Sequence, residues 1–332
     1  MRKQVTMKDI AEEMDVSIVT VSKALAGKDG VSEELRGRII EKSRQLGYVV
    51  KNEQRDTVQY NPNIAIAISE RFIGDNAFYL KIYQRIIMEM SPKGFIGILE
   101  IIRREDEDAG VIPKVVQMHT AEQIVIVGEM KLTFLENLSK TGVHMIFFDF
   151  DNEEFDVDCI VSDNVRGGYV MTRYLVKNGY KKIGFVGNYK ATRNILDRLA
   201  GHLKYKLAKS LQQRDSWLIS DRSIEGEELA LQLPDDMPEA FFCNCDESAY
   251  RLIRTLSEAG FRVPEDIAVV GYDDYASYVP EGVGLTTYRV DTDEMIRQCI
   301  HILEQRSMNP DYRRGVVLVQ GKLVERDSVL KK

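Results

Sequence analysis

Near the start of the chain, the segment DVSIVTVSKAL places two aliphatic residues among short hydroxyl side chains and a lysine. Hydroxyls and an ammonium group can hydrogen-bond to phosphate oxygens, and small apolar groups can pack on thymine methyls. A buried helix would be more apolar than this segment, and an ordinary surface helix would carry more charge. The side chains concerned are Ser17, Ile18, Val19, Thr20, Ser22 and Lys23.

Three short helices are predicted to hold these side chains. Thr6, Ser17 and Ser32 each precede an apolar pattern of helical period, and hydroxyl residues at such positions cap the free amides of a helix. Three helices with a three-residue turn between the first two form a helix-turn-helix, whose second helix reads base edges in the major groove. The alternative is a three-helix packing unit in which Ile18 and Val19 are exposed by accident.

The string VTMKDIAEEMDVSIVTVSKALAG…VSEELRGRIIEKSRQLGY resembles the DNA-binding headpiece of the lactose/galactose repressor family. The base-reading residues that the resemblance implies are Ile18, Val19 and Lys23. The contacts to the DNA backbone that it implies are Thr6, Ser17, Thr20 and Ser22. Met14 and Asp15 stand where the family usually has a small residue and a glycine in the turn.

The segment that follows the headpiece departs from the family pattern. In the family this hinge becomes a short helix on operator DNA and inserts a leucine into the minor groove. Here Arg55 keeps a basic residue and is expected to contact DNA, but Glu53 and Gln54 replace small residues and Thr57 replaces the leucine. An acidic residue near phosphates is unfavourable and threonine is a poor wedge. We therefore interpret the segment as a solvated tether and expect the protein to bend its operator less than its relatives do.

From Ile64 onward, short apolar runs alternate with amphipathic helical patterns. This alternation predicts parallel sheets covered by helices on both faces, and the number of apolar runs indicates two lobes rather than one sheet. Ligands of such sheets bind beyond the carboxyl ends of the strands. The polar residues at those ends are the site candidates Asp149, Asp163, Asp246 and Asp273.

The same region resembles the effector-binding core of the family, which has the two-lobed fold of periplasmic sugar-binding proteins. The strings that carry the resemblance are NAFY, FFDFD, VSDNVRGGYVMTRYLVKNGYKKIGFVG, DRLAGHLKY, VVGYDD…GLTTYRVDTDEM and LVERDSV. The resemblance implies that the chain crosses between lobes near residues 161, 290 and 320. The expected divisions are a DNA-binding domain at 1–49, a hinge at 50–62 and a core at 63–328, with an N-lobe of about 63–161 and 291–320 and a C-lobe of about 162–290 and 321–328.

The effector-binding residues implied by the resemblance are Phe78, Tyr79, Asp149, Arg198, Cys245 and Asp273. Carboxylates accept hydrogen bonds from vicinal hydroxyls, a guanidinium donates in a planar fork, and aromatic faces cover the apolar side of a sugar ring. Cys245 replaces an asparagine of the family and is a weak hydrogen-bond partner. Trp217 and Arg222 lie where the family also contributes pocket residues. The alternatives are that Asp273 and Asp163 cap helices and that Phe78 belongs to the core.

Composition limits the other classes of protein. The 332 residues carry a net charge of −7, but residues 1–58 hold 11 Lys and Arg against 10 Asp and Glu, so the N-terminal part is the least acidic. No apolar run approaches the roughly 18 residues of a membrane span, and no secretion signal is recognised. The four scattered cysteines favour a reducing cytoplasm, and the C-x-C at Cys243 and Cys245 lacks nearby ligands for a metal. We expect no metal and no cofactor.

The sequence therefore predicts a cytoplasmic, dimeric transcription regulator, most simply a repressor, that binds a pseudo-palindromic operator under the control of a small carbohydrate or related metabolite. One alternative is a regulator controlled by a partner protein. A DNA-tethered sugar-processing enzyme is the other, but the sequence contains no P-loop, no G-x-S-x-G and no H-E-x-x-H motif.

Overall fold

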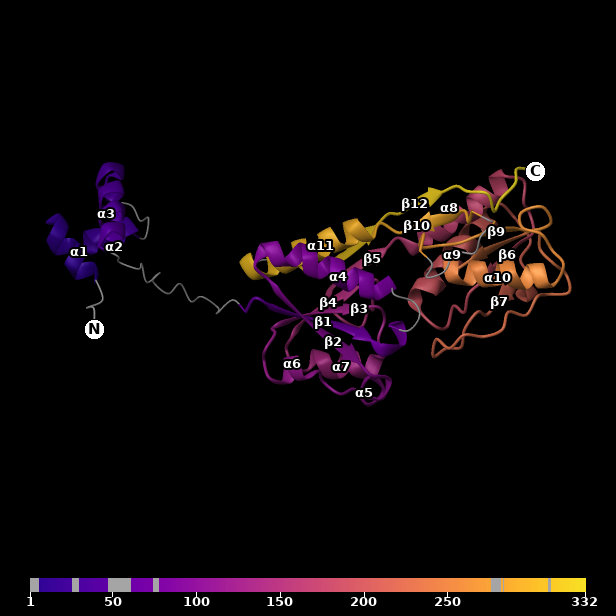
Figure 1. Cartoon of the computed structure of the whole chain (residues 1–332), viewed down its shortest axis with the longest axis horizontal. Helices are drawn as coiled ribbons and strands as arrows, with labels where there is room; N and C mark the ends of the chain where they lie inside the picture. The colour runs from indigo at the N-terminus through magenta and orange to yellow at the C-terminus, as the bar shows by residue number, and fades with distance from the viewer. Residues whose placement is uncertain are drawn as a thin grey trace. The chain divides into compact units, whose positions relative to one another are not determined.

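The computed structural model describes residues 6–25, 30–46, 61–73, 78–275, 282, 284–309 and 312–332. The chain divides into two compact units, Met1–Tyr60 and Asn61–Lys332 (Figure 1). Arg55, together with the rest of the expected hinge up to residue 60, lies outside the described residues.

The first unit contains the three predicted helices, α1 (Met7–Met14), α2 (Ile18–Leu25) and α3 (Glu33–Gln45). All three predicted caps form. Thr6 accepts a hydrogen bond from the amide of Asp9 at 3.4 Å, in a capping box with the Asp9 carboxylate. Ser17 accepts from the amide of Thr20 at 3.0 Å, and Ser32 accepts from the amide of Leu35 at 3.3 Å. Each serine or threonine therefore fixes where its helix begins.

The three helices pack around a small apolar core. Its buried members are Ile10, Ala11, Val21, Ala24 and Ile39. Asp15 ends α1 in the left-handed conformation at φ 52°, which an aspartate tolerates better than most residues. The tight turn that follows lets α1 and α2 bury their apolar faces against each other.

The first lobe of the second unit is a six-stranded sheet in the order β11-β5-β4-β3-β1-β2, with every neighbouring pair parallel. Its strands are β1 (Asn63–Ser69), β2 (Ile96–Ile102), β3 (Gln123–Val127), β4 (His144–Phe148), β5 (Asp158–Ser162) and β11 (Val316–Val319). Successive residues of β1 pack into different apolar clusters, one containing Ile66 and the other Ala67. The sheet is therefore buried on both faces, as parallel sheets are.

Helices cover both faces of this sheet (Figure 1). The helices α4 (Phe78–Met90) and α11 (Thr292–Met308) lie together on one face. The helices α5 (Arg104–Ala109), α6 (Lys114–Gln117) and α7 (Leu132–Ser139) lie on the other.

The second lobe is a four-stranded parallel sheet in the order β7-β6-β8-β9. Its strands are β6 (Ile183–Val186), β7 (Leu218–Ile219), β8 (Ala240–Cys243) and β9 (Ala268–Val270). The helices α8 (Asn164–Lys177) and α9 (Arg193–Ala208) pack through Met171 and Leu199 on one face. The helix α10 (Asp246–Glu258) packs through Leu252 on the other.

The chain passes between the lobes three times. It leaves the first lobe after β5 to form α8, and it returns after β10 (Thr287–Arg289) to form α11. It leaves again after β11 to form β12 (Lys322–Val324), which pairs antiparallel with β10. The fold class is therefore as predicted: a helical helix-turn-helix unit and a two-lobed α/β core with parallel sheets.

Candidate functional site

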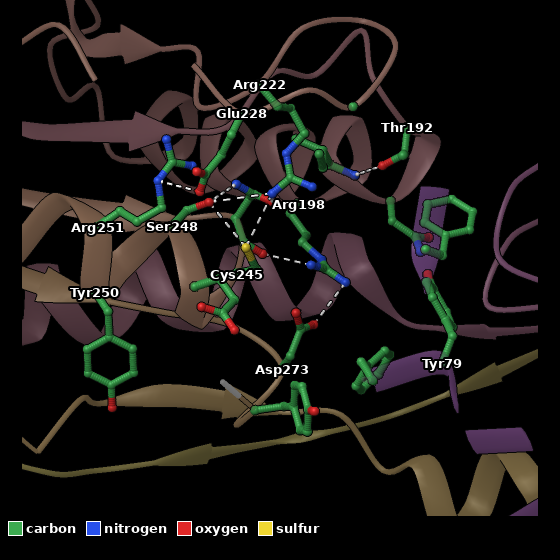
Figure 2. A pocket seen from close by; sticks show the side chains of 18 of the residues that line it. Tyr79, Thr192, Arg198, Arg222, Glu228, Cys245, Ser248, Tyr250, Arg251 and Asp273 are labelled. Carbon is green, nitrogen blue, oxygen red and sulfur yellow. Dashed lines mark hydrogen bonds and ion pairs between the residues drawn. The ribbon is translucent and has the colours of Figure 1, made fainter. Parts of the chain in front are cut away.

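A cavity of about 1090 Å³ opens between the two lobes of the core, beyond the carboxyl ends of the strands. All six residues that the sequence marked as effector contacts line it. Phe78, Tyr79 and Asp149 come from the first lobe, and Arg198, Cys245 and Asp273 come from the second. Figure 2 shows Tyr79 on the opposite side of this space from Cys245 and Ser248.

Asp149 follows β4 and turns its carboxylate toward the cavity. Its φ of 66° lies in the left-handed region, and its Oδ2 accepts a hydrogen bond from the Tyr79 hydroxyl at 2.8 Å. Burial raises the pKa of Asp149 to about 6, although the nearby Arg198 acts to lower it. The pKa of the Tyr79 hydroxyl is raised well above its usual value, first by burial and then by Asp149. Tyr79 is therefore a neutral donor, and Asp149 changes charge near neutral pH.

Arg198, on α9, contacts several neighbouring groups and is only 6% exposed. Its Nε donates to Asn164 Oδ1 at 2.9 Å, and its Nη1 donates to the main-chain oxygen of Asn244 at 2.7 Å. Its Nη2 lies 3.2 Å from Asp273 Oδ1, and its guanidinium stacks 3.9 Å from the ring centre of Tyr272. These contacts fix the plane of the guanidinium before any ligand arrives.

Asp273 is held beside this guanidinium by the end of the strand before it. Its φ is 96°, and its amide donates to the main-chain oxygen of Tyr288 at 2.8 Å. Burial raises the pKa of Asp273, while Arg198 and Arg222 act to lower it. Residues 274 and 275, which directly follow Asp273 and are described by the structure, are not helical, so the alternative interpretation of Asp273 as a helix cap is wrong. For Asp163 the cap is correct, because its carboxylate accepts from the amide of Arg166 at 3.1 Å at the start of α8.

A second arginine, Arg222, lies on the same wall as Arg198 (Figure 2). Its Nε and Nη2 both donate to Oδ2 of the fully buried Asp221, at 3.0 and 2.7 Å. Burial acts to raise the pKa of Asp221, but Arg222 and the hydrogen bonds from Ser248 and Asn244 lower it to about 2. Asp221 is therefore a permanent anion that orients Arg222.

Cys245 precedes α10 and lies between these groups. Its Sγ is 3.4 Å from Arg222 Nη2 and 3.2 Å from the Ser248 hydroxyl. Burial raises the pKa of Cys245, so the side chain is a neutral thiol at ordinary pH. The position is occupied by a weak hydrogen-bonding group, as the sequence indicated.

Two aromatic predictions have different outcomes. Phe78 lines the cavity and also packs against the core, with its ring centre 5.2 Å from that of Tyr79 and 5.3 Å from that of Tyr275, so its position is compatible with both interpretations. Trp217 does not line the cavity. It is fully buried, and its Nε1 donates to the main-chain oxygen of Asp236 at 2.7 Å. The suggested pocket role of Trp217 is therefore wrong, because its ring is packed inside the second lobe, with Lys206 Nζ 5.4 Å from the ring centre.

Sequence reasoning missed several residues that line the cavity, including Arg71, Thr192, Ser248 and Arg251. Arg71 follows β1 and lies 3.3 Å from the buried Glu107, and Thr192 caps α9. Arg71 lies just after a strand and Thr192 lies at the start of a helix, and both positions can be recognised in the sequence as places where ligand-binding residues occur. Arg251 lies in mid-helix on α10, where nothing in the local pattern distinguishes it from a surface arginine.

Several polar contacts join the two lobes at the cavity. The amide of Arg193, at the start of α9, donates to Glu129 Oε2 at 2.8 Å, and its Nη1 donates to Glu153 Oε2 at 2.5 Å. Asn194 Nδ2 donates to the main-chain oxygen of Asp149 at 2.7 Å. Because Asn164 donates to Asn194 Oδ1 at 2.8 Å and accepts from Arg198, one hydrogen-bonded chain runs from Arg198 to the first lobe.

The helical unit presents a separate candidate surface on α2. Ile18 and Val19 are 49% and 63% exposed, and Lys23 is also exposed. The hydroxyls of Ser17 and Thr20 lie 2.9 Å apart, and both residues stand at the first turn of the helix. Ser22 is half-buried and Thr6 is exposed at the start of α1. Arg55 is the one predicted DNA contact outside the described residues.

Two features are absent from the described part of the chain. Within it, no group of three or more His, Cys, Asp or Glu side chains is placed to hold a metal ion. Nor does any of its helices combine the length and the apolar character needed to cross a membrane.

Comparisons with known proteins agree with this architecture. Residues 6–50 match the family model described as bacterial regulatory proteins, lacI family, and residues 172–329 match the periplasmic binding protein-like domain. The HTH-type transcriptional repressor PurR of Klebsiella pneumoniae (strain 342) is 25% identical over 98% of this chain and 96% of its own length.

Two solved structures have the same fold over nearly the whole chain. The transcriptional regulator CelR–cellobiose complex has a TM-score of 0.69 at 22% identity and covers 98% of this chain and 100% of its own. The lac repressor dimer bound to operator and the anti-inducer ONPF has a TM-score of 0.67 at 22% identity and covers 99% and 100%.

The fold and the matches together define a lacI-type helix-turn-helix domain joined to a two-lobed, periplasmic-binding-protein-like core. Residues 6–50 carry the helix-turn-helix domain of the lacI family of bacterial regulatory proteins, and the chain is similar over 98% of its length to a repressor of the HTH type.

Proposed function

We propose that the chain acts as a dimeric repressor whose operator affinity is controlled by a small sugar-like effector bound between the lobes of its core. The observation that carries the proposal is the arrangement of Arg198, Asp149 and Asp273 around one interlobe cavity. A fixed guanidinium flanked by two carboxylates offers donors and acceptors to adjacent hydroxyls of a sugar. Tyr79 and Phe78 add aromatic surface for the apolar side of a ring.

An effector in this cavity can control operator affinity because the residues that contact it come from both lobes. Asp149 and Tyr79 belong to the first lobe, while Arg198 and Asp273 belong to the second. An effector that contacts both sets stabilises one arrangement of the lobes over others, and a ligand can shift an equilibrium only by such a difference in affinity. The cellobiose and anti-inducer complexes of the two related structures support a carbohydrate-like effector here.

The proposal assigns base contacts to Ile18, Val19 and Lys23, and backbone contacts to the hydroxyls around them. The exposed aliphatic pair suits thymine methyls, and Lys23 suits a guanine or a phosphate. A two-fold dimer would present two such helices to a pseudo-palindromic operator. The lac repressor relative was solved as a dimer on its operator, which supports the same assembly for this chain. Such a protein works in the cytoplasm, where the DNA is.

The experiment that tests the proposal uses the full chain throughout. Selection from a pool of random duplexes at modest salt should enrich one sequence with two-fold symmetry, and Lys23→Ala should weaken binding to it by roughly 10-fold or more. A thermal-shift screen of sugars and related metabolites should find a ligand that raises the melting temperature. That ligand should change the affinity for the selected duplex.

The variant Arg198→Ala should abolish the thermal shift, because it removes the central donor and leaves the buried Asp273 unpaired. Arg262→Ala removes an exposed arginine of the same lobe, paired only with Asp266, and serves as the matched control. A protein with no preference for any duplex, or an effector that binds equally well to Arg198→Ala, would contradict the proposal. Operator affinity that responds to a partner protein but to no small molecule would favour the alternative form of control.

A further inference from the structure

The two ends of the cavity differ in the hydrogen-bonding groups that they leave free. One end is formed by two carboxylates from different lobes: Asp149 Oδ2 accepts from Tyr79, and Asp273 Oδ1 lies beside Arg198. Asp273 Oδ2 has no donor among the described residues and can accept from a ligand. The carboxylates at this end can accept hydrogen bonds from the hydroxyls of a ligand.

The end formed by Arg222 has the opposite character. Arg222 Nε and Nη2 are used by Asp221, Asn244, Cys245 and Ser248, but Nη1 has no acceptor among the described residues. Figure 2 shows the Arg222 guanidinium beside that of Arg198, on the wall that bounds the cavity. The two arginines meet at one residue, because Arg198 Nη1 donates to the main-chain oxygen of Asn244 and Arg222 Nη2 lies 3.5 Å from its Oδ1.

Asp221, the carboxylate paired with Arg222, is not available to bind a ligand. Asp221 is fully buried and lies behind the guanidinium, and its oxygens already accept from Arg222, Asn244 Nδ2 at 2.8 Å, Ser248 Oγ at 2.5 Å and the amide of Asn188 at 3.0 Å. On the cavity side this end therefore presents the guanidinium, whose Nη1 can still donate, beside a neutral thiol, because the Ser248 hydroxyl already donates its proton to Asp221.

The other charged side chains near Arg222 leave this end of the cavity positively charged. Glu228 is paired with Arg251 Nε at 2.8 Å (Figure 2). Glu247 has an interaction of its own, and Glu258 is exposed at the far end of α10. Arg254 lines the cavity, is exposed and has no partner among the described residues.

From this asymmetry we propose that the effector is an acidic carbohydrate, a sugar acid or a sugar phosphate. Its acid group lies against Arg222 and its hydroxyls lie against Asp149 and Asp273. The inference rests on the proposed function, since it specifies the ligand of the same cavity. A carboxylate and a phosphate share the property that matters here, which is several charged acceptor oxygens on one centre. Such a group can accept from the free Nη1 and from neighbouring donors together. A neutral hydroxyl supplies one uncharged acceptor and leaves the guanidinium less well satisfied.

The test compares matched neutral and acidic ligands with the intact chain. The probes are glucose, gluconate, glucuronate and glucose 6-phosphate, then galactose, galacturonate and galactose 6-phosphate, and inorganic phosphate alone. Binding is measured by thermal shift and by calorimetry at constant ionic strength. We expect at least one acid to bind about 10- to 100-fold more tightly than its neutral parent, which is the range for a hydrogen bond to a charged group. The comparison of carboxylates with phosphates identifies the kind of acid.

A variant then tests whether Arg222 binds the acid group of the ligand. Arg222→Gln alone would leave the buried Asp221 without its cation, so the principal variant is Asp221→Asn with Arg222→Gln, which removes both charges together. It should bring the affinity for the acid down to that of the neutral parent. Arg262→Gln removes an exposed arginine elsewhere in the lobe and should leave the preference intact.

Each other outcome overturns the inference. If a neutral sugar binds as tightly as the acids derived from it, the inference is wrong. It is also wrong if none of the acidic sugars binds and inorganic phosphate does not bind at tens of millimolar. An acid preference that survives in the double variant would mean that another group reads the charge. If a neutral sugar binds and its binding depends on Arg198, the proposed function is supported and only the inference of an acidic effector is wrong. A chain that selects no duplex and responds to no metabolite would remove the proposed function itself.

Discussion

The carboxylate of Asp149 is buried and accepts a hydrogen bond from the Tyr79 hydroxyl. The cation that acts on its pKa is Arg198, which belongs to the other lobe. Burial raises the pKa of Asp149 from 3.8 to about 6, so the folded protein holds this proton more tightly than the unfolded chain does. The stability that this difference contributes is present below pH 3.8 and is lost as pH rises through about 6. Above that pH the ionised group costs up to about 3 kcal/mol, at about 1.4 kcal/mol for each pKa unit.

We therefore expect Asp149→Asn to stabilise the ligand-free core at pH 7.5, by about 1–3 kcal/mol, and by roughly a third of that amount at pH 4.5. Asparagine keeps an acceptor for Tyr79 and tolerates the φ of 66°, so the change isolates the charge. Melting temperatures of both proteins between pH 4.5 and 7.5 measure the difference. Asp156→Asn, whose side chain is 90% exposed, is the control. A difference between the Asp149 variant and wild type that does not grow with pH would contradict this account.

Which residues line the cavity could be predicted from sequence only where position in an element carried the signal. Asp149 and Asp273 follow apolar strands, and the carboxyl ends of parallel strands bound the ligand site. Arg222 follows the two-residue strand β7, too short to show a pattern, and its role depends on Asp221 beside it being buried. Trp217 was misassigned because its neighbours in sequence do not reveal that packing buries it.

At the level of the helices, Ser17 has two possible functions that a suitable substitution can separate. Its hydroxyl caps α2 through the amide of Thr20, and the proposed function also places it near a phosphate. Aspartate caps helices about as well as serine, but its negative charge repels a phosphate. Ser17→Asp should therefore keep the melting temperature of the helical unit close to that of wild type and weaken operator binding by about 10-fold or more.

Ser17→Ala provides the comparison. It loses the cap, at a cost of about 1 kcal/mol to the stability of the helical unit, and brings no charge to the DNA. Circular dichroism of the full chain follows the helices, and a fluorescence titration with the selected duplex follows binding. If Ser17→Asp binds the operator as wild type does, Ser17 does not lie near a phosphate.

The helices and strands themselves could largely be predicted, since their signals are local. Thr6, Ser17 and Ser32 each mark the start of a helix, and successive residues such as Ile66 and Ala67 in β1 pack on opposite faces of a sheet. The chain that joins the lobes through Asn164 and Asn194 could not be predicted. It depends on three side chains from α8 and α9 meeting in space, which no local pattern encodes.

For the whole core, communication between lobes depends on contacts that exist only when the lobes approach each other. Arg193 carries two of them, because its guanidinium lies 3.7 Å from Glu129 and donates to Glu153, both on the first lobe. Its side chain is partly exposed, so each pair is worth at most about 1 kcal/mol. The sum is still enough to shift an equilibrium between two lobe arrangements of similar free energy.

Arg193→Ala should therefore weaken effector binding by about 3- to 10-fold, while Arg262→Ala should not. It should also change the factor by which effector and operator alter each other's affinity, because that factor measures how strongly the two ligands prefer different lobe arrangements. The measurement is a thermodynamic cycle: operator affinity with and without saturating effector, and effector affinity with and without saturating operator. The two factors within each protein must agree, and the factor for Arg193→Ala should be smaller than that for wild type. An unchanged factor would mean that these interlobe ion pairs take no part in the response, whatever they contribute to binding.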